Sequence, residues 1–229
     1  MGVLQGTNLL VFAIGAGFEL EPEDSGHPLL SLCGGAATAS ACQSSGNTVL
    51  DDNFKNPDPG WGQPDNIAAF TPISLALTPP VSGSAWRWNG NFTMAHADWC
   101  VDVMSPGKLP DPADEDSVGA VGVWFWGRDS QNFYTASITL DGQASVMRLV
   151  AGKWLTIVAP AAAASVKTAP GAVNEIEVLT DGNTAQFFVN GTHVTDIHGQ
   201  APPNGGAPGV YGESGPKITT WLFQRARLF

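Results

Sequence analysis

The sequence predicts an all-β fold, an antiparallel β-sandwich built from two sheets. Apolar residues make up 43% of the 229 residues and charged residues only 14%, a composition that can bury a large core. The 27 glycines and 17 prolines fall between short apolar runs, as the turns of β proteins require. After Asp51, helical periodicity is nearly absent, and β-rich segments recur every ~10–15 residues, which is the spacing of a sandwich.

One hairpin sets the register of the predicted sheets. Residues 121–126 (VGVWFW) and 133–140 (FYTASITL) flank a polar loop and are expected to pair. The opposed pairs are Trp126 with Phe133, Phe125 with Tyr134, and Trp124 with Thr135. Because side chains alternate between the two faces of a strand, one face is apolar and belongs to the core: Val121, Val123, Phe125, Tyr134, Ile138 and Leu140. The other face combines large rings with hydroxyls, as a surface that meets water or a ligand does: Trp124, Trp126, Phe133, Thr135, Ser137 and Thr139.

The remaining strands follow in order between turn signals. Asp141-Gly142 and Asn190-Gly191 are typical of tight hairpin turns. Residues 159–165 (APAAAAS) are expected to be a loop or the edge of a strand. In total we expect about eleven to thirteen strands, with no connection long enough for a parallel crossover. Strands that follow the first hairpin are predicted at residues 145–150, 155–158, 174–179, 185–189, 192–197, 210–211 and 218–229.

Residues 1–48 form an N-terminal extension before the predicted sandwich domain at residues 49–229. Residues 29–41 (LLSLCGGAATASA) are similar to the apolar region of an export signal, and they end in an A-x-A cleavage pattern. Cys42 follows directly, as the lipid-bearing cysteine of a lipoprotein does. The alternative is that the extension adds a strand and a loop to the sandwich. Its apolar runs are too short to span a bilayer, so we expect no transmembrane span.

Three cysteines, Cys33, Cys42 and Cys100, are too few for a disulfide framework. In an oxidising compartment, either Cys33 or Cys100 could pair with Cys42, which leaves one thiol over. Three reduced and mostly buried thiols are the alternative.

The charge of the chain excludes one class of partner. Ten Lys and Arg stand against 21 Asp and Glu, which gives a net charge of −11, and the basic residues are scattered. Nucleic-acid binding needs clustered Lys and Arg, so we exclude it. Acidic side chains suit Ca²⁺, for which Asp51, Asp52 and the loop Asp114-Glu115-Asp116 are candidates, with a solvated acidic surface as the alternative.

We assign no catalytic residue from the sequence. Retaining glycosidases need two carboxylates about 5–5.5 Å apart. The nearest approach here is Glu175 and Glu177, which share one face of a strand and which we expect to be solvated. None of the four histidines lies beside a serine or cysteine in a nucleophile motif.

Four segments resemble the laminin-G-like domains of the jelly-roll, concanavalin A-like class. They are Asp51-Asp52-Asn53-Phe54 with Trp61, residues 124–157 (WFWGRDSQNFYTASITLDGQASVMRLVAGKWLTI), residues 174–194 (NEIEVLTDGNTAQFFVNGTHV) and residues 206–215 (GAPGVYGESG). In this order they cover residues 51–229, and they look most like the bacterial 3-keto-disaccharide hydrolase-type domains. The resemblance implies a jelly-roll sandwich that works outside the cytoplasm, periplasmic or secreted, in association with carbohydrate.

The outward-facing rings form the candidate ligand site. Sugars stack the C–H faces of their rings on aromatic side chains, and neighbouring polar groups set their orientation. One alternative is that loops or the N-terminal extension cover these rings as a second small core, and another is a docking surface for a protein partner. The candidate residues are Trp124, Trp126 and Phe133 as a platform, Arg128, Gln131 and Asn132 at its edge, and Trp86 and Trp88, which also share a face.

Three functions remain open from the sequence. The first is a non-catalytic, extracytoplasmic module that binds a glycan or polysaccharide on one sheet face. The second is a hydrolase of the 3-keto-disaccharide type. The third is a structural or accessory subunit that docks on a larger assembly, either membrane-bound or not. A cleft with paired carboxylates would favour the hydrolase, and an open aromatic groove would favour the binding module.

Overall fold

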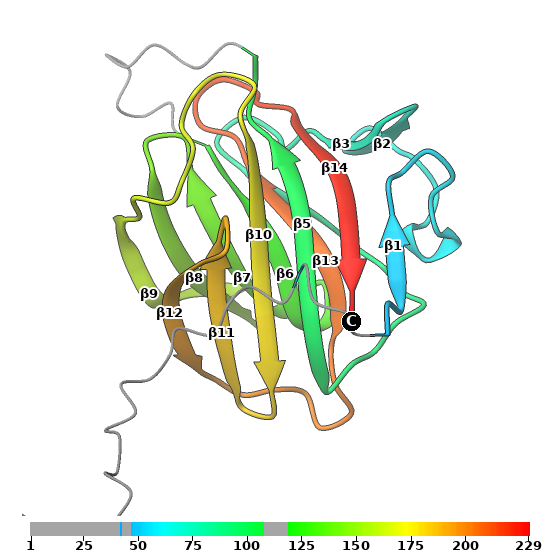
Figure 1. Ribbon diagram of the computed structural model, residues 1–229, viewed down its shortest axis with the longest axis vertical. Helices are drawn as coiled ribbons and strands as arrows, with labels where there is room; N and C mark the ends of the chain where they lie inside the picture. Colours follow the sequence, from blue (N-terminus) through cyan, green and yellow to red (C-terminus); the bar gives the residue numbers. More distant parts are fainter. Residues whose placement is uncertain (1–41, 43–46, 108–118) are drawn as a thin grey trace, which may run out of the picture. The chain divides into compact units, whose positions relative to one another are not determined.

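The computed structural model describes Cys42 and residues 47–107 and 119–229, and it confirms the predicted all-β sandwich. Two antiparallel sheets pack face to face, and Figure 1 shows the larger in front of the smaller. In spatial order, sheet A contains β12 (Thr192–His198), β11 (Thr184–Val189), β10 (Val173–Asp181), β5 (His96–Met104), β14 (Trp221–Leu228), β3 (Ser74–Leu77) and β2 (Ala68–Thr71), with β1 (Leu50–Asp52) also paired to β14. Sheet B contains β4 (Ser84–Trp88), β13 (Ala207–Glu213), β6 (Ala120–Asp129), β7 (Asn132–Thr139), β8 (Gln143–Val150) and β9 (Lys153–Ala162).

The turns follow the sequence signals. Asn190 and Gly191 both have positive φ, 51° and 74°, as the two central residues of a type I′ hairpin turn do. The turn before β9 is Ala151-Gly152, so this strand begins at Lys153 and continues to Ala162 at the free edge of sheet B. The expected strand edge at residues 159–165 is thus confirmed for residues 159–162. The one helical element among the described residues is a 3₁₀ turn, η1 (Pro59–Trp61), and no described helix has the length and apolarity to cross a membrane.

The main core lies between the two sheets, and the predicted inward face supplies much of it. Pairing is regular from Ala120↔Thr139 to Phe125↔Tyr134. All six residues of the predicted apolar face belong to the main core, together with inward side chains of sheet A such as Trp99 and Phe223.

Trp126 departs from the predicted alternation. After Phe125↔Tyr134, the next pair is Asp129↔Asn132, so three residues of β6 stand against the single residue Phe133. This bulge begins at Trp126, whose φ is +47°. Its indole turns into the main core, 3% exposed, and meets Tyr134 edge-on with ring centroids 5.1 Å apart. The predictions that Trp126 opposes Phe133 and faces outward are therefore wrong.

The two acidic residues at the start of the domain serve the fold. Asp51 pairs with Arg225 at 2.7 Å. Asp52 is buried and accepts hydrogen bonds from the backbone N–H groups of Phe54 and Asp58 and from Trp61 Nε1. These partners tie β1 to η1 and to β14 and engage both oxygens of each carboxylate, and calcium binding at this pair stays a prediction. The second calcium candidate, residues 114–116, lies outside the described residues.

Cys42 is bonded to Cys100 on β5, with Cα atoms 6.1 Å apart, which selects one of the pairings left open by the sequence. A sulfur in a disulfide cannot also carry a thioether-linked lipid, so the lipoprotein reading of Cys42 does not fit this structure. The other predictions for the extension, an export signal or an added strand, fall mainly on residues outside those described.

Candidate functional site

A second aromatic cluster lies on the face of sheet B that points away from the core. Trp124, Phe133, Leu149 and Tyr211 are buried there, with Trp86 packed against them. Trp88 and Trp154 extend the cluster. The name aromatic face is used below for six of these side chains: Trp86 and Trp88 on β4, Trp124 on β6, Phe133 on β7, Trp154 on β9 and Tyr211 on β13.

The aromatic face has a buried floor, formed by Trp124 and Phe133, and an exposed rim, formed by Trp88 and Trp154. Trp124 stacks on Phe133, with ring centroids 3.8 Å apart and planes 15° apart, and Trp88 stacks on Trp124 at 5.2 Å. Trp124 is 1% exposed, whereas Trp88 is 38% exposed and Trp154 is 37% exposed. The outward face predicted for Trp124 and Phe133 is thus confirmed, and so is the prediction that Trp86 and Trp88 share a face. For Trp124 and Phe133, the alternative of a small second core holds.

Sheet B curves around this face. The rings of Trp154 and Tyr211 meet at 5.8 Å, although β6, β7 and β8 lie between their strands. In a flat sheet these strands would be about 19 Å apart. Two side chains and the gap between their rings cannot span that distance. The aromatic face is therefore concave, and Trp154 reaches over its floor.

A pocket of about 550 Å³ opens at one end of the aromatic face, within the usual size range of ligand sites. Two loops form one wall and are held together by backbone hydrogen bonds, from Ser82 N–H to Gly215 O (2.8 Å) and from Ser214 N–H to Gly83 O (3.0 Å). Trp154 forms another wall. The full lining is Ser82, Gly83, Ser84, Trp154, Glu213, Ser214, Gly215 and Pro216.

Polar groups beside the pocket are linked in a chain. The hydroxyl of Tyr211 donates a hydrogen bond to Oε1 of Glu213, and it is also hydrogen-bonded to Ser84. Burial, and then the neighbouring Glu213 charge, raises the pKa of Tyr211 far above its ordinary value. Tyr211 therefore stays a neutral phenol that fixes the Glu213 carboxylate in place.

The floor also holds polar atoms. Trp124 Nε1 and Thr135 Oγ1 are buried, and neither has a hydrogen-bond partner among the described residues. Ser137 and Ser145 hydroxyls lie 3.3 Å apart on the adjacent strands. Buried polar groups are nearly always satisfied in proteins, so this part of the floor keeps hydrogen-bonding capacity beside its rings.

The predicted polar edge lies in the β6–β7 turn and does not line the pocket. Asn132 Nδ2 donates to Asp129, and Asn132 Oδ1 accepts from the Ala151 N–H, which ties two turns together. Arg128 is exposed and pairs with Asp129 at 3.3 Å, and Gln131 donates its backbone N–H to the same carboxylate. Asn132 therefore has a structural role. The pocket is not lined by any of the three residues predicted to lie at the edge of the ligand site, Arg128, Gln131 and Asn132.

Sequence reasoning missed Trp154, Tyr211 and Glu213. The predicted strand at residues 155–158 begins too late, since β9 starts at Lys153 and Trp154 is its second residue. The predicted strand at residues 210–211 ended too early, since β13 continues to Glu213. With that extension, alternation along the strand would have put Tyr211 and Glu213 on one face.

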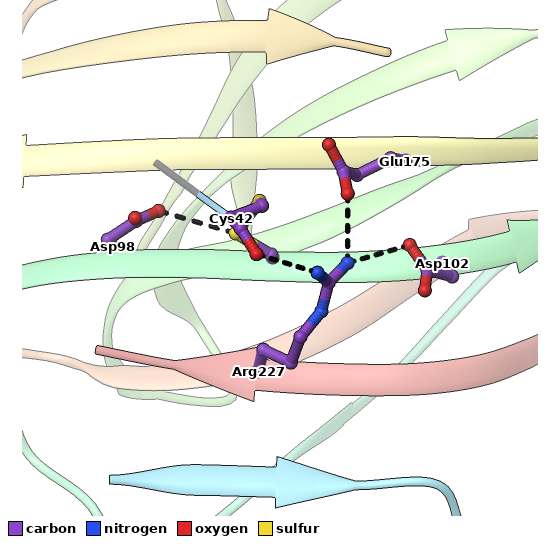
Figure 2. The surroundings of a disulfide bond; sticks show 6 residues. Cys42, Asp98, Asp102, Glu175 and Arg227 are labelled. Atoms are coloured by element: carbon purple, nitrogen blue, oxygen red, sulfur yellow. Dashed lines mark hydrogen bonds and ion pairs between the residues drawn. A yellow bond between two sulfur atoms is a disulfide. The ribbon is translucent and has the colours of Figure 1, made fainter. Parts of the chain in front are cut away.

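A second group of polar residues lies on the outer face of sheet A, around the disulfide. Figure 2 shows Arg227 between Asp102 and Glu175, with each carboxylate 2.9 Å from Nη2. Nη1 of Arg227 donates to the carbonyl of Cys42 at 2.8 Å. Glu177 is 1% exposed. The prediction that Glu175 and Glu177 form a solvated strand face is therefore wrong, because Cys42 is bonded to Cys100 on this part of the sheet.

Asp98 and Glu177 form a buried acid pair beside the disulfide. Burial and the charge of Glu177 raise the pKa of Asp98 to about 7. Ligand atoms of Cys42, Asp98, Cys100 and Glu177 lie within 4.8 Å of one another. The two sulfurs are bonded to each other and offer no thiolate to a metal. Both carboxyls are buried, so a substrate cannot reach them as it would reach the acid pair of a glycosidase.

Comparison with known proteins agrees with the fold. No protein-family model and no curated protein matches the sequence. Among solved structures, the carbohydrate binding module CBM66 from Bacillus subtilis aligns with a TM-score of 0.55 at 14% identity, covering 79% of this chain and 95% of that chain. The metal-free carbohydrate recognition domain of Emp46p aligns at 0.56 with 10% identity, covering 80% and 95%.

An enzyme shares the same architecture. The β-glucanase of Bacillus licheniformis aligns with a TM-score of 0.53 at 11% identity, covering 80% of this chain and 98% of that chain. Identities this low establish the jelly-roll, concanavalin A-like fold and leave the activity to be argued from the site.

Proposed function

We propose that this chain is a non-catalytic carbohydrate-binding module that uses the concave aromatic face of sheet B. The observation that carries the proposal is the pocket, where the exposed Trp154 lies with the carboxylate of Glu213 and the hydroxyls of Ser82 and Ser84. A pyranose ring has apolar C–H faces and a rim of hydroxyl groups. An aromatic wall with hydrogen-bonding groups beside it is complementary to such a ring.

The rest of the aromatic face extends the proposed site. Trp88 is exposed on β4, and its ring is supported from below by Trp124. A rigid, packed ring loses little conformational entropy when a ligand stacks on it. The likeness to a carbohydrate binding module and a carbohydrate recognition domain supports the proposal through the fold. The disulfide supports an oxidising, extracytoplasmic compartment, periplasmic or secreted.

Binding is favoured over hydrolysis by the carboxylates at the site. Glu213 is the one carboxylate among the described residues that line the pocket. Its Oε1 is already engaged by Tyr211. Glycoside hydrolysis requires a second carboxyl group across the scissile bond.

The experiment is a glycan array followed by calorimetry on the strongest hit. Trp154→Ala and Trp88→Ala are each expected to weaken binding about tenfold or more, because each removes a stacking surface. Leu155→Ala is the matched control, since Leu155 is also exposed and directly follows Trp154. Absence of any glycan signal with the wild-type chain, or equal binding by all the variants, would refute the proposal.

A further inference from the structure

The charges around the pocket determine which sugars it can accept. Of the eight lining residues, Glu213 alone is ionisable. The chain as a whole has 21 acidic and ten basic residues. We propose that the pocket selects uncharged sugars and rejects acidic ones, such as uronic acids, with Glu213 as the residue that determines this specificity. This inference rests on the proposed carbohydrate-binding function.

Glu213 is held as a fixed acceptor. Tyr211 donates to its Oε1, and the buried phenol stays neutral, so that hydrogen bond persists across the physiological pH range. Only Oε1 of this carboxylate has a hydrogen-bond partner among the described residues, which leaves Oε2 for a ligand. A carboxylate accepts hydrogen bonds and donates none. Its natural partner in the pocket is therefore a hydroxyl group, of which a neutral sugar presents several.

An acidic sugar would bring a second negative charge next to this carboxylate. Two like charges a few ångströms apart repel strongly in a partly desolvated site, and neither could donate a hydrogen bond to the other. The hydroxyl of Ser82 can donate to an anion, whereas that of Ser84 is already hydrogen-bonded to Tyr211, and neither carries a charge to offset the repulsion.

Two lysines are close to the lining in sequence. Lys153 precedes Trp154 and Lys217 follows Pro216, and both are exposed. Neither lines the pocket. Lys153 alternates with Trp154 along β9, so it projects from the opposite side of that strand. The charge of the lining itself is therefore that of Glu213.

The pocket is built before a ligand arrives. The two loops of its wall are joined by the hydrogen bonds of Ser82 and Ser214. Ser214 also donates through its hydroxyl to the carbonyl of Pro79. A wall fixed in this way cannot easily turn Glu213 aside to admit an anion, so the discrimination is intrinsic to the folded chain.

The test compares sugars that differ only in charge. Neutral oligogalactosides and the matching oligogalacturonides, which carry a carboxylate in place of the hydroxymethyl group, are titrated into the full chain by calorimetry. The variant is Glu213→Gln, which keeps an acceptor for Tyr211 and removes the charge. The control is Asp181→Asn, which removes an exposed carboxylate in sheet A. Circular dichroism checks that each variant is folded.

The wild-type chain is expected to bind the neutral partner at least about tenfold more tightly, with a smaller ratio at high salt. Glu213→Gln should reduce that ratio about tenfold, while Asp181→Asn leaves it unchanged. Equal or tighter binding of the acidic partner by the wild type, or an unchanged ratio in Glu213→Gln, would overturn the selectivity while leaving carbohydrate binding intact. Binding of neither partner, nor of any sugar on the array, would overturn the proposed function itself.

Discussion

Trp124 stacks on Phe133 with ring centroids only 3.8 Å apart, on the side of sheet B that faces away from the main core. Two adjacent strands, β6 and β7, thus contribute a ring each to a pair that is almost completely buried. The pair supports Trp86 and Trp88, which lie against it. A buried aromatic pair in this position holds the exposed rings of the proposed binding surface in place, so a ligand that stacks on them costs little conformational entropy.

We expect substitutions in the floor of the aromatic face to lower mainly the free energy of unfolding, and substitutions at its rim to lower mainly the affinity for sugar. Phe133→Ala removes a buried ring and should lower the free energy of unfolding by about 3–5 kcal/mol. Trp88→Ala removes a partly exposed ring, so it should lower the free energy of unfolding by less than Phe133→Ala does, while it reduces the affinity for sugar. Chemical denaturation and calorimetry on both variants measure the two effects. Equal losses of stability in the two variants would contradict the division into a floor and a rim.

A glycine controls the position of Trp124. A Cβ placed on Gly127 would clash with the indole nitrogen of Trp124, which lies directly against the bulge. Gly127→Ala is therefore expected to displace the indole, lower stability by about 1–3 kcal/mol and change the near-UV circular dichroism. Gly107→Ala is the matched control, because nothing lies within 4 Å of its Cβ position. Unchanged near-UV spectra in Gly127→Ala would argue against this packing.

The bulge at Trp126 marks where prediction from the sequence stopped working. Alternation assigned Val121 through Phe125 correctly, because pairing with β7 is regular there. The bulge then places two consecutive side chains, Phe125 and Trp126, in the same core. A pattern of period two cannot anticipate such a change, since it depends on which residues pair and on a positive φ.

The pocket and the buried pair of Asp98 and Glu177 could not be predicted from the sequence, because both depend on contacts between residues far apart in the chain. Trp154 and Tyr211 meet only because sheet B curves, and the curvature of a sheet cannot be predicted from the spacing of residues along the chain. Glu175 and Glu177 have the alternation of an exposed strand face. Glu177 is buried and Glu175 half-buried because Cys42 is bonded to Cys100 of the neighbouring strand, a contact between residues 58 positions apart. The fold class and the hairpin turns could be predicted because their signals lie in short stretches of the sequence.

The disulfide is expected to stabilise the sandwich substantially. Linking residues 58 positions apart restricts the unfolded chain, which corresponds to about 4 kcal/mol in the chain-entropy model. The double variant Cys42→Ser/Cys100→Ser should lose about 2–4 kcal/mol in urea denaturation. Adding a reductant to the denatured wild type and refolding it should reproduce that loss. A double variant as stable as the wild type would show that the bond contributes little to the fold.

Stability should fall as the pH rises towards neutrality, because of Asp98. Its pKa is about 7 in the folded protein and 3.8 in its ordinary range, so between these values the folded state holds a proton that the unfolded state has released. Raising the pH through this window therefore lowers the free energy of unfolding, by on the order of 2–4 kcal/mol. Burial also raises the pKa of Asp102, which acts in the same direction.

Asp98→Asn isolates the contribution of the acid pair. Because Asn cannot ionise, the free energy of unfolding of the variant should differ much less between pH 5 and pH 8 than that of the wild type. At pH 8 the variant should be more stable than the wild type. Asp51→Asn is the comparison, because the hydrogen bond from Arg225 lowers the pKa of Asp51 and its contribution is lost only in more acidic solution. Urea denaturation at both pH values measures the effect. Glu177, Glu175 and Arg227 remain in both variants, so a pH dependence that persists undiminished in Asp98→Asn would show that Asp98 is not the group that holds the proton.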